Sequence, residues 1–170
     1  EYDKRALAIA EELGLRAHKA TYLNNIGTVY DSWGRYDQAL EYYEHALAID
    51  EELGRELEIA NRLNNIGYVH ALQGRHDRAL EHYERALAIA ENLGQEAEAA
   101  ILVNNIGNTF KALGNHQKAL AWYERALAAA EALGRNDEVA SRLNNIGGLY
   151  RTRGRYRAAL EYYERALAIV

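Results

Sequence analysis

The chain has 170 residues, of which 49 % are apolar and 26 % charged, so it can bury a core and is neither disordered nor collagenous. Its net charge of -5 argues against a phosphate-binding surface, and the absence of Cys excludes disulfides, thiolate metal sites and a Cys nucleophile. No apolar run approaches the roughly 18 residues of a membrane span, so no membrane partner is expected. The acidic net charge argues against nucleic acid as a partner, and we expect a cytoplasmic chain.

The sequence repeats itself with a period of 40 residues. The block Asn-Asn-Ile-Gly begins at Asn24, Asn64, Asn104 and Asn144. We therefore expect a single array of repeats over residues 1–170. Its parts are the second helix of a preceding repeat (1–14), three full repeats (15–54, 55–94 and 95–134) and a truncated last repeat (135–170).

Each repeat is predicted to contain two helices. In the repeat at 55–94, a first segment runs from Glu56 to Leu72 and a second from Asp77 to Leu93. Gly74 and Gly94 follow these segments, and glycine readily takes the left-handed conformation that ends a helix.

Local polar interactions are expected to support the second helix of each repeat. Asp37 and Asp77 come shortly after the turn glycine and are predicted to be N-caps. Glu81 and Arg85 have the favourable i,i+4 order for an ion pair on the helix surface.

The apolar residues fall on one face of each helix. This face comprises Leu23, Ile26, Gly27 and Tyr30 on the first helix, and Ala39, Leu40, Tyr43, Ala46 and Leu47 on the second. A glycine inside a helix costs about 1 kcal/mol relative to alanine. The recurrence of Gly27 in every repeat therefore predicts a close approach to the second helix, where Ala39 supplies a small residue.

This pattern resembles the tetratricopeptide repeat. The signature of that family, a Leu-Gly pair followed by Tyr, Ala, an aromatic residue and Ala, corresponds here to Ile26-Gly27, Tyr30, Ala39, Tyr43 and Ala46. The period exceeds the family's usual value of about 34, and the usual proline is absent, so the chain is similar to the extended subtype of kinesin light chains and bacterial arrays. The resemblance implies an all-α fold, a right-handed solenoid of antiparallel helix pairs with about four and a half repeats.

The opposite face of each first helix is expected to line the concave side of this array. The groove positions that helical spacing selects are Thr21, Asn25, Thr28, Asn61, Asn65, Tyr68, Asn105, Asn108, Ser141 and Asn145. The positions at the groove edge are Asn24, Asn64, Asn104, Asn144, Lys111 and Arg151. Because a carboxamide both donates and accepts hydrogen bonds, it can bind a peptide backbone without reading its sequence.

Two interpretations of the repeated asparagines stay open, contact with a bound peptide and hydrogen bonding within the scaffold. For the column that begins at Asn25 we favour peptide contact, as the resemblance implies, and for the column that begins at Asn24 the structural role. Positions that vary between repeats, such as Thr28 and Tyr68, are candidates for selectivity. The inner positions hold no Lys or Arg, so the clamp for a terminal carboxylate found in this family is not expected.

No catalytic residue, cofactor or metal site is predicted. The sequence shows no nucleophile with its base, no phosphate loop and no paired carboxylates. Among the histidines, His70 takes the place of Tyr30, and His76 and His116 take the place of Tyr36. These histidines are therefore interpreted as substituted structural aromatics rather than metal ligands.

The sequence thus predicts a non-enzymatic scaffold for protein–protein interaction whose concave face binds a peptide or helix through an Asn ladder. The alternative is a regulatory or sensor array that controls an attached ATPase, protease or DNA-binding domain in a longer parent protein. The final helix keeps its apolar pattern as far as Val170, so weak head-to-tail self-association through uncapped ends is also expected.

Overall fold

The computed structural model describes residues 9–10 and 12–169, and no strand occurs among them. The described helices are α2 (Arg16–Ser32), α3 (Tyr36–Glu52), α4 (Glu56–Leu72), α5 (His76–Asn92), α6 (Glu96–Ala112), α7 (His116–Ala132), α8 (Asn136–Thr152) and α9 (Tyr156–Leu167). None of these eight is long and apolar enough to cross a membrane. The half-repeat expected at 1–14 lies largely outside the described residues, as does Val170.

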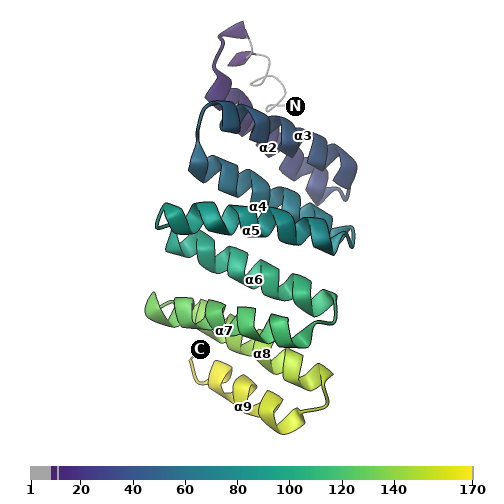
Figure 1. The fold of residues 1–170 in the computed structure, drawn as a ribbon, viewed down its shortest axis with the longest axis vertical. Coiled ribbons are helices and arrows are strands. Elements are labelled where there is room, and N and C mark those ends of the chain that lie inside the picture. Colours follow the sequence, from purple (N-terminus) through teal and green to yellow (C-terminus); the bar gives the residue numbers. More distant parts are fainter. Residues whose placement is uncertain (1–8, 11, 170) are drawn as a thin grey trace. The chain divides into compact units, whose positions relative to one another are not determined.

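The helices form two compact units, Glu1–Leu93 and Gly94–Val170, each with the same internal order (Figure 1). In the first unit α2 packs against α3 and α4 against α5, while α3 also packs against α4. In the second unit α6 packs against α7 and α8 against α9, while α7 packs against α8. Each 40-residue repeat is therefore one pair of neighbouring helices, as the period predicts.

The helix ends follow the glycine columns. The first helix of the repeat at 55–94 has the predicted bounds, and the second begins and ends one residue earlier than predicted. Gly74 and Gly94 have φ of +73° and +66°, in the left-handed region that glycine enters without steric cost. Each glycine therefore ends one helix and directs the chain into the next.

The predicted N-caps are wrong. Arg35 and Arg75 occupy the N-cap positions of α3 and α5 without a side-chain cap hydrogen bond, and Asp37 and Asp77 lie in the first turn. An aspartate in the first turn still favours the helix, because its charge opposes the positive end of the helix dipole. The Oδ1 of Asp37 accepts a hydrogen bond from Nε2 of Gln73 at 3.0 Å, so this side chain joins α3 to the end of α4.

The predicted ion pair within α5 is also replaced by a contact between helices. Nη2 of Arg85 lies 2.6 Å from Oε1 of Glu51, at the end of α3, rather than on Glu81. Both partners are well exposed, so the pair adds little to stability.

A tyrosine of each second helix packs onto the mid-helix glycine of the first, and Tyr43, Tyr83 and Tyr123 are buried there. A Cβ placed on Gly67 would lie 2.8 Å from a ring carbon of Tyr83 and 3.2 Å from the carbonyl oxygen of Ala79. The same packing joins Gly27 to Tyr43, Gly107 to Tyr123 and Gly147 to Tyr163. The close approach predicted from the glycine column is confirmed, and it fixes which face of each first helix is left for other contacts.

Candidate functional site

The candidate groove positions lie on first helices, α2 and α4 in the first unit and α6 and α8 in the second. The exposed members are Thr21, Asn25, Thr28, Asn61, Tyr68, Asn108 and Ser141, and the partly buried ones are Asn65, Asn105 and Asn145. None of them is fully buried, in contrast to the glycine face of the same helices. Each unit therefore presents its groove positions to solvent, and their binding role stays a prediction.

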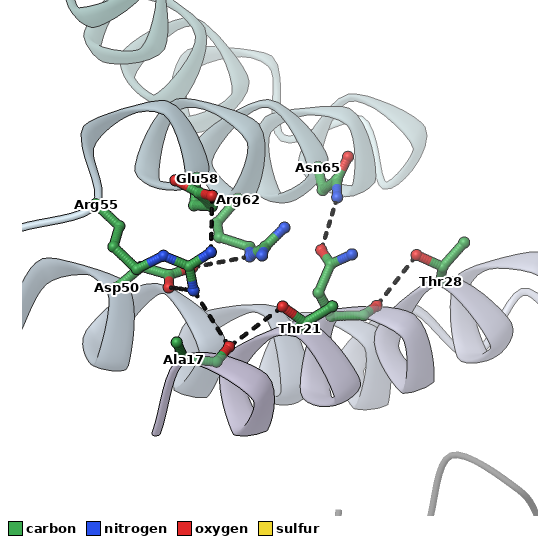
Figure 2. Close-up of polar contacts among 9 residues, drawn as sticks. Ala17, Thr21, Thr28, Asp50, Arg55, Glu58, Arg62 and Asn65 are labelled. Atoms are coloured by element: carbon green, nitrogen blue, oxygen red, sulfur yellow. Dashed lines mark hydrogen bonds and ion pairs between the residues drawn. The ribbon is translucent and has the colours of Figure 1, made fainter. Parts of the chain in front are cut away.

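Asparagines of successive first helices are joined by hydrogen bonds. Nδ2 of Asn65 on α4 donates to Oδ1 of Asn24 on α2 at 3.0 Å (Figure 2). In the second unit, Nδ2 of Asn145 on α8 donates to Oδ1 of Asn104 on α6 at 3.1 Å. Within each unit, one such hydrogen bond therefore links the first helices of two neighbouring repeats. Because a carboxamide has one acceptor oxygen and two donor hydrogens, Asn65 keeps its Oδ1 and one N–H outside this bond.

Buried tyrosine hydroxyls reach the variable positions of the same face. The hydroxyl of Tyr43 donates to Oγ1 of Thr28 at 3.2 Å, and that of Tyr123 donates to Oδ1 of Asn108 at 2.6 Å. Burial raises the pKa of Tyr123 to about 12, so its hydroxyl stays protonated and remains a donor at neutral pH. These bonds connect the side chains that vary between repeats to the packed tyrosines beneath them.

In each unit we call the side of the first helices that carries the groove positions the groove face. Amides lie beside apolar side chains on it, and none of the groove positions is charged. Tyr68 and Leu72 of α4 are 47 % and 46 % exposed, and Ile101 of α6 is 48 % exposed. The basic residues at the edge differ in exposure, since Lys111 is partly buried and Arg151 is exposed. Such a face suits an uncharged ligand segment that offers backbone amides and apolar side chains.

Sequence reasoning missed a buried charged cluster between α3 and α4. Asp50 is fully buried, and its Oδ1 and Oδ2 accept hydrogen bonds from Nη1 of Arg55 and Nε of Arg62, both at 3.1 Å (Figure 2). Arg55 also donates to Oε1 of Glu58 at 2.7 Å and to the carbonyl oxygen of Ala17 at 3.2 Å. The only signal in the sequence is an aspartate in a column that holds alanine in the next two repeats.

The histidine that replaces an aromatic residue packs as one. His70 is buried, with its ring centroid 5.4 Å from that of His82. The equivalent stacked pairs are Tyr30 with Tyr42 and Tyr150 with Tyr162, at 5.3 and 5.4 Å. Burial lowers the pKa of His70, and the nearby His82, Arg75 and Arg78 lower it further. Within the described ranges, no three His, Asp or Glu side chains are grouped closely enough to hold a metal ion.

Comparison with known proteins agrees with this architecture. A family model described as tetratricopeptide repeat matches residues 1–52, 58–132 and 97–170. Among curated proteins, none matches the chain.

Several solved structures are similar to the chain. BtubC (BKLC) from P. vanneervenii is 28 % identical, with a TM-score of 0.83. The match covers 91 % of this chain and 64 % of BtubC, so this chain spans less than two thirds of the length of BtubC. The nearly identical TPR-like repeats of a putative kinesin light chain from Podosopora anserina are 17 % identical, with a TM-score of 0.81 and coverage of 98 % and 82 %. A Rap protein complexed with competence and sporulation factor is 22 % identical, with a TM-score of 0.81 and coverage of 90 % and 43 %. These matches confirm the predicted fold class, an all-α solenoid of helix pairs.

Proposed function

The chain belongs to the tetratricopeptide repeat family, whose repeats are typical of scaffolds for protein–protein interaction, and we propose that it binds an extended peptide or a helix of a protein partner on the groove face of its first helices. In this proposal the array is not an enzyme and acts in the cytoplasm. The partner's backbone would contact the Asn25, Asn65, Asn105 and Asn145 column, and Thr28, Tyr68 and Asn108 would select among side chains.

One observation supports this proposal above the others. The hydrogen bond from Nδ2 of Asn65 to Oδ1 of Asn24 holds the Asn65 side chain in a partly exposed position, with one acceptor and one donor left over. A pre-ordered amide loses little rotamer freedom when it binds, so more of each new hydrogen bond appears as affinity. Tyr68 and Leu72 lie further along the same helix and supply exposed apolar area. The similarity to a Rap protein complexed with competence and sporulation factor is in keeping with a proteinaceous ligand.

The test is selection of peptides from a random display library on the full chain, followed by affinity measurements on variants. The double variant Asn65→Ala with Asn105→Ala should weaken binding of the selected peptides by roughly 1–3 kcal/mol, the scale of hydrogen bonds lost at a desolvated interface. A matched control, Glu84→Ala with Glu124→Ala, changes an exposed column of the second helices and should leave affinity unchanged. If the asparagine variant loses stability while the folded fraction binds with full affinity, the column serves the scaffold alone.

A second candidate is an array that regulates an attached effector domain. The match with the Rap protein covers 43 % of that protein, so more than half of it lies outside the matched part. By analogy, this array would regulate a further domain of a longer parent protein. An effector joined to the array would respond to occupation of the same groove face. Its activity should therefore change when a selected peptide is added, and this response should be lost with Asn65→Ala.

Weak self-association is part of the proposal as well. On helix α9, the side chains of Tyr156, Leu160 and Leu167 are 71 %, 56 % and 78 % exposed. Leu40 of α3, which is equivalent to Leu160, is only 7 % exposed because α4 packs against α3. Apolar area of this kind favours stacking between copies at high concentration. Sedimentation over a wide concentration range tests it, and a monomer throughout would contradict it.

A further inference from the structure

The two units share a charged cluster at the junction between a second helix and the following first helix. The first unit holds Arg55, Glu58 and Arg62, and the second holds their equivalents Arg135, Glu138 and Arg142. The fourth position differs, because Asp50 of α3 corresponds to Ala130 of α7. Both side chains at this position are fully buried.

In the first unit the cluster is balanced. Two guanidinium groups face two carboxylates, and the buried Nε of Arg62 donates to Oδ2 of Asp50 at 3.1 Å. The other Asp50 oxygen accepts from Arg55. Removal of either partner from such a buried pair would leave a charge without compensation.

In the second unit one carboxylate faces two guanidinium groups. Nη1 of Arg135 lies 3.0 Å from Oε1 of Glu138, and Nη2 of Arg142 lies 3.6 Å from Oε2 of the same glutamate. Arg142 is 9 % exposed, and its Nε is buried without a hydrogen-bond partner in the described part of the chain. Oε2 of Glu138 is likewise buried without a hydrogen-bond partner, since its distance to Nη2 of Arg142 is beyond a hydrogen bond. The cluster thus has an unpaired buried donor, an unpaired buried acceptor and one positive charge in excess.

The junction between the second and third full repeats has other residues at the same positions. It has Ala90 at the aspartate position and Leu102 at the Arg62 position, so alanine there accompanies an apolar residue. Only the junction before the last repeat combines alanine, at 130, with arginine, at 142. Arg142 occupies the same position of the repeat as Arg62, while the carboxylate that pairs with Arg62 is missing.

We propose that the second unit binds a small carboxylate ion, of the size of formate, beside Ala130. Its oxygens would accept from Nε of Arg142 and from Arg135, as those of Asp50 accept from Arg62 and Arg55. Asp and Ala differ by one carboxylate group, which limits the ligand to a small planar anion, and a guanidinium group favours a planar carboxylate. The side chains of Arg135 and Glu138 are 40 % and 30 % exposed, so two members of the cluster reach solvent.

The experiment is a titration of the full ¹⁵N-labelled chain with sodium formate, using sodium chloride at equal ionic strength as reference. The Nε–H resonance of Arg142 should shift saturably with formate. At ten times the dissociation constant, formate should raise the thermal midpoint by roughly 3–6 °C. N-Acetylglycine, which presents the carboxylate of a peptide terminus, should give no saturable shift because the site is too small for it.

Variants make the result specific. Ala130→Asp supplies the missing carboxylate, so it should raise the midpoint without formate and abolish the formate response. Asp50→Ala should create the same response at Arg62. If Ala130→Asp does not fold, Arg142→Leu, which restores the residue found at 102, should fold and lose the response. The proposal is overturned if formate gives no saturable shift in the native chain, if N-acetylglycine binds as well as formate, or if a folded Ala130→Asp or Arg142→Leu chain responds as the native one does.

Discussion

Replacing Gly107 of α6 by alanine should destabilise the second unit, although alanine is the better helix former. The new Cβ would lie 2.8 Å from Cδ1 and Cε1 of Tyr123 and 3.4 Å from Cβ of Trp122. Tyr123 is fully buried, and its hydroxyl is bonded to Oδ1 of Asn108 at 2.6 Å. The ring therefore cannot retreat without disturbing its neighbours and stretching this hydrogen bond.

The size of the effect follows from three contributions. Overpacking a core costs roughly 1–3 kcal/mol. Weakening the Tyr123–Asn108 hydrogen bond costs about 1 kcal/mol more, and the higher helix propensity of alanine returns about 1 kcal/mol. We expect a net loss of about 1–3 kcal/mol, which for a chain of this length lowers the thermal midpoint by roughly 2–12 °C.

Gly148, on α8 of the same unit, provides the control. A Cβ on Gly148 would meet only the hydroxyl oxygen of Tyr163, at 3.8 Å, an ordinary contact. Gly148→Ala should therefore gain about 1 kcal/mol from helix propensity and raise the midpoint by roughly 2–4 °C. Thermal unfolding followed by circular dichroism measures both variants. If Gly107→Ala is as stabilising as Gly148→Ala, the glycine column is not required for packing and the reasoning is refuted.

Two further changes test the buried polar groups. Asp50→Ala should lower the free energy of unfolding by roughly 3–5 kcal/mol, because it leaves Arg62 buried without its partner. Urea unfolding measures this loss, and a loss below about 1 kcal/mol would contradict the prediction. Since the pKa of His70 is lowered in the folded chain, its contribution to stability is complete above its ordinary value of about 6.5 and is lost as the pH falls. His70→Phe, which introduces the residue found at Phe110, should therefore reduce the loss of stability between about pH 8 and pH 5, and an unchanged pH dependence would show that other groups cause it.

Much of the fold could be predicted because two rules act locally. Only glycine takes positive φ at little cost, so the glycine columns located every turn, and the spacing of apolar residues identified the packed faces. The errors arose where long polar side chains have several partners of similar energy. Asp37 bonds to Gln73 of the next helix, and Arg85 to Glu51 of the preceding second helix, and neither partner can be chosen from local spacing.

The candidate site was predicted as a set of positions but not as a set of contacts. The repeat placed the asparagine columns on first helices, while the bond from Asn65 to Asn24 depends on the register between repeats. The charged cluster could not be predicted from the repeat pattern, because Asp50 occurs in one repeat alone. Its pairing with Arg55 and Arg62 depends on how α3 packs against α4, which the spacing of residues in the sequence does not determine.

The central claim is that the groove face of the first helices binds a protein segment. The most direct measurement maps a selected peptide onto the ¹⁵N-labelled chain through the side-chain amide resonances of asparagine. If the peptide binds there, the side-chain amides of Asn25 and Asn65 should shift saturably, while the backbone amides of Glu84 and Glu124 on the second helices should not change. Shifts confined to the second helices, with the asparagine amides unmoved at saturation, would contradict it.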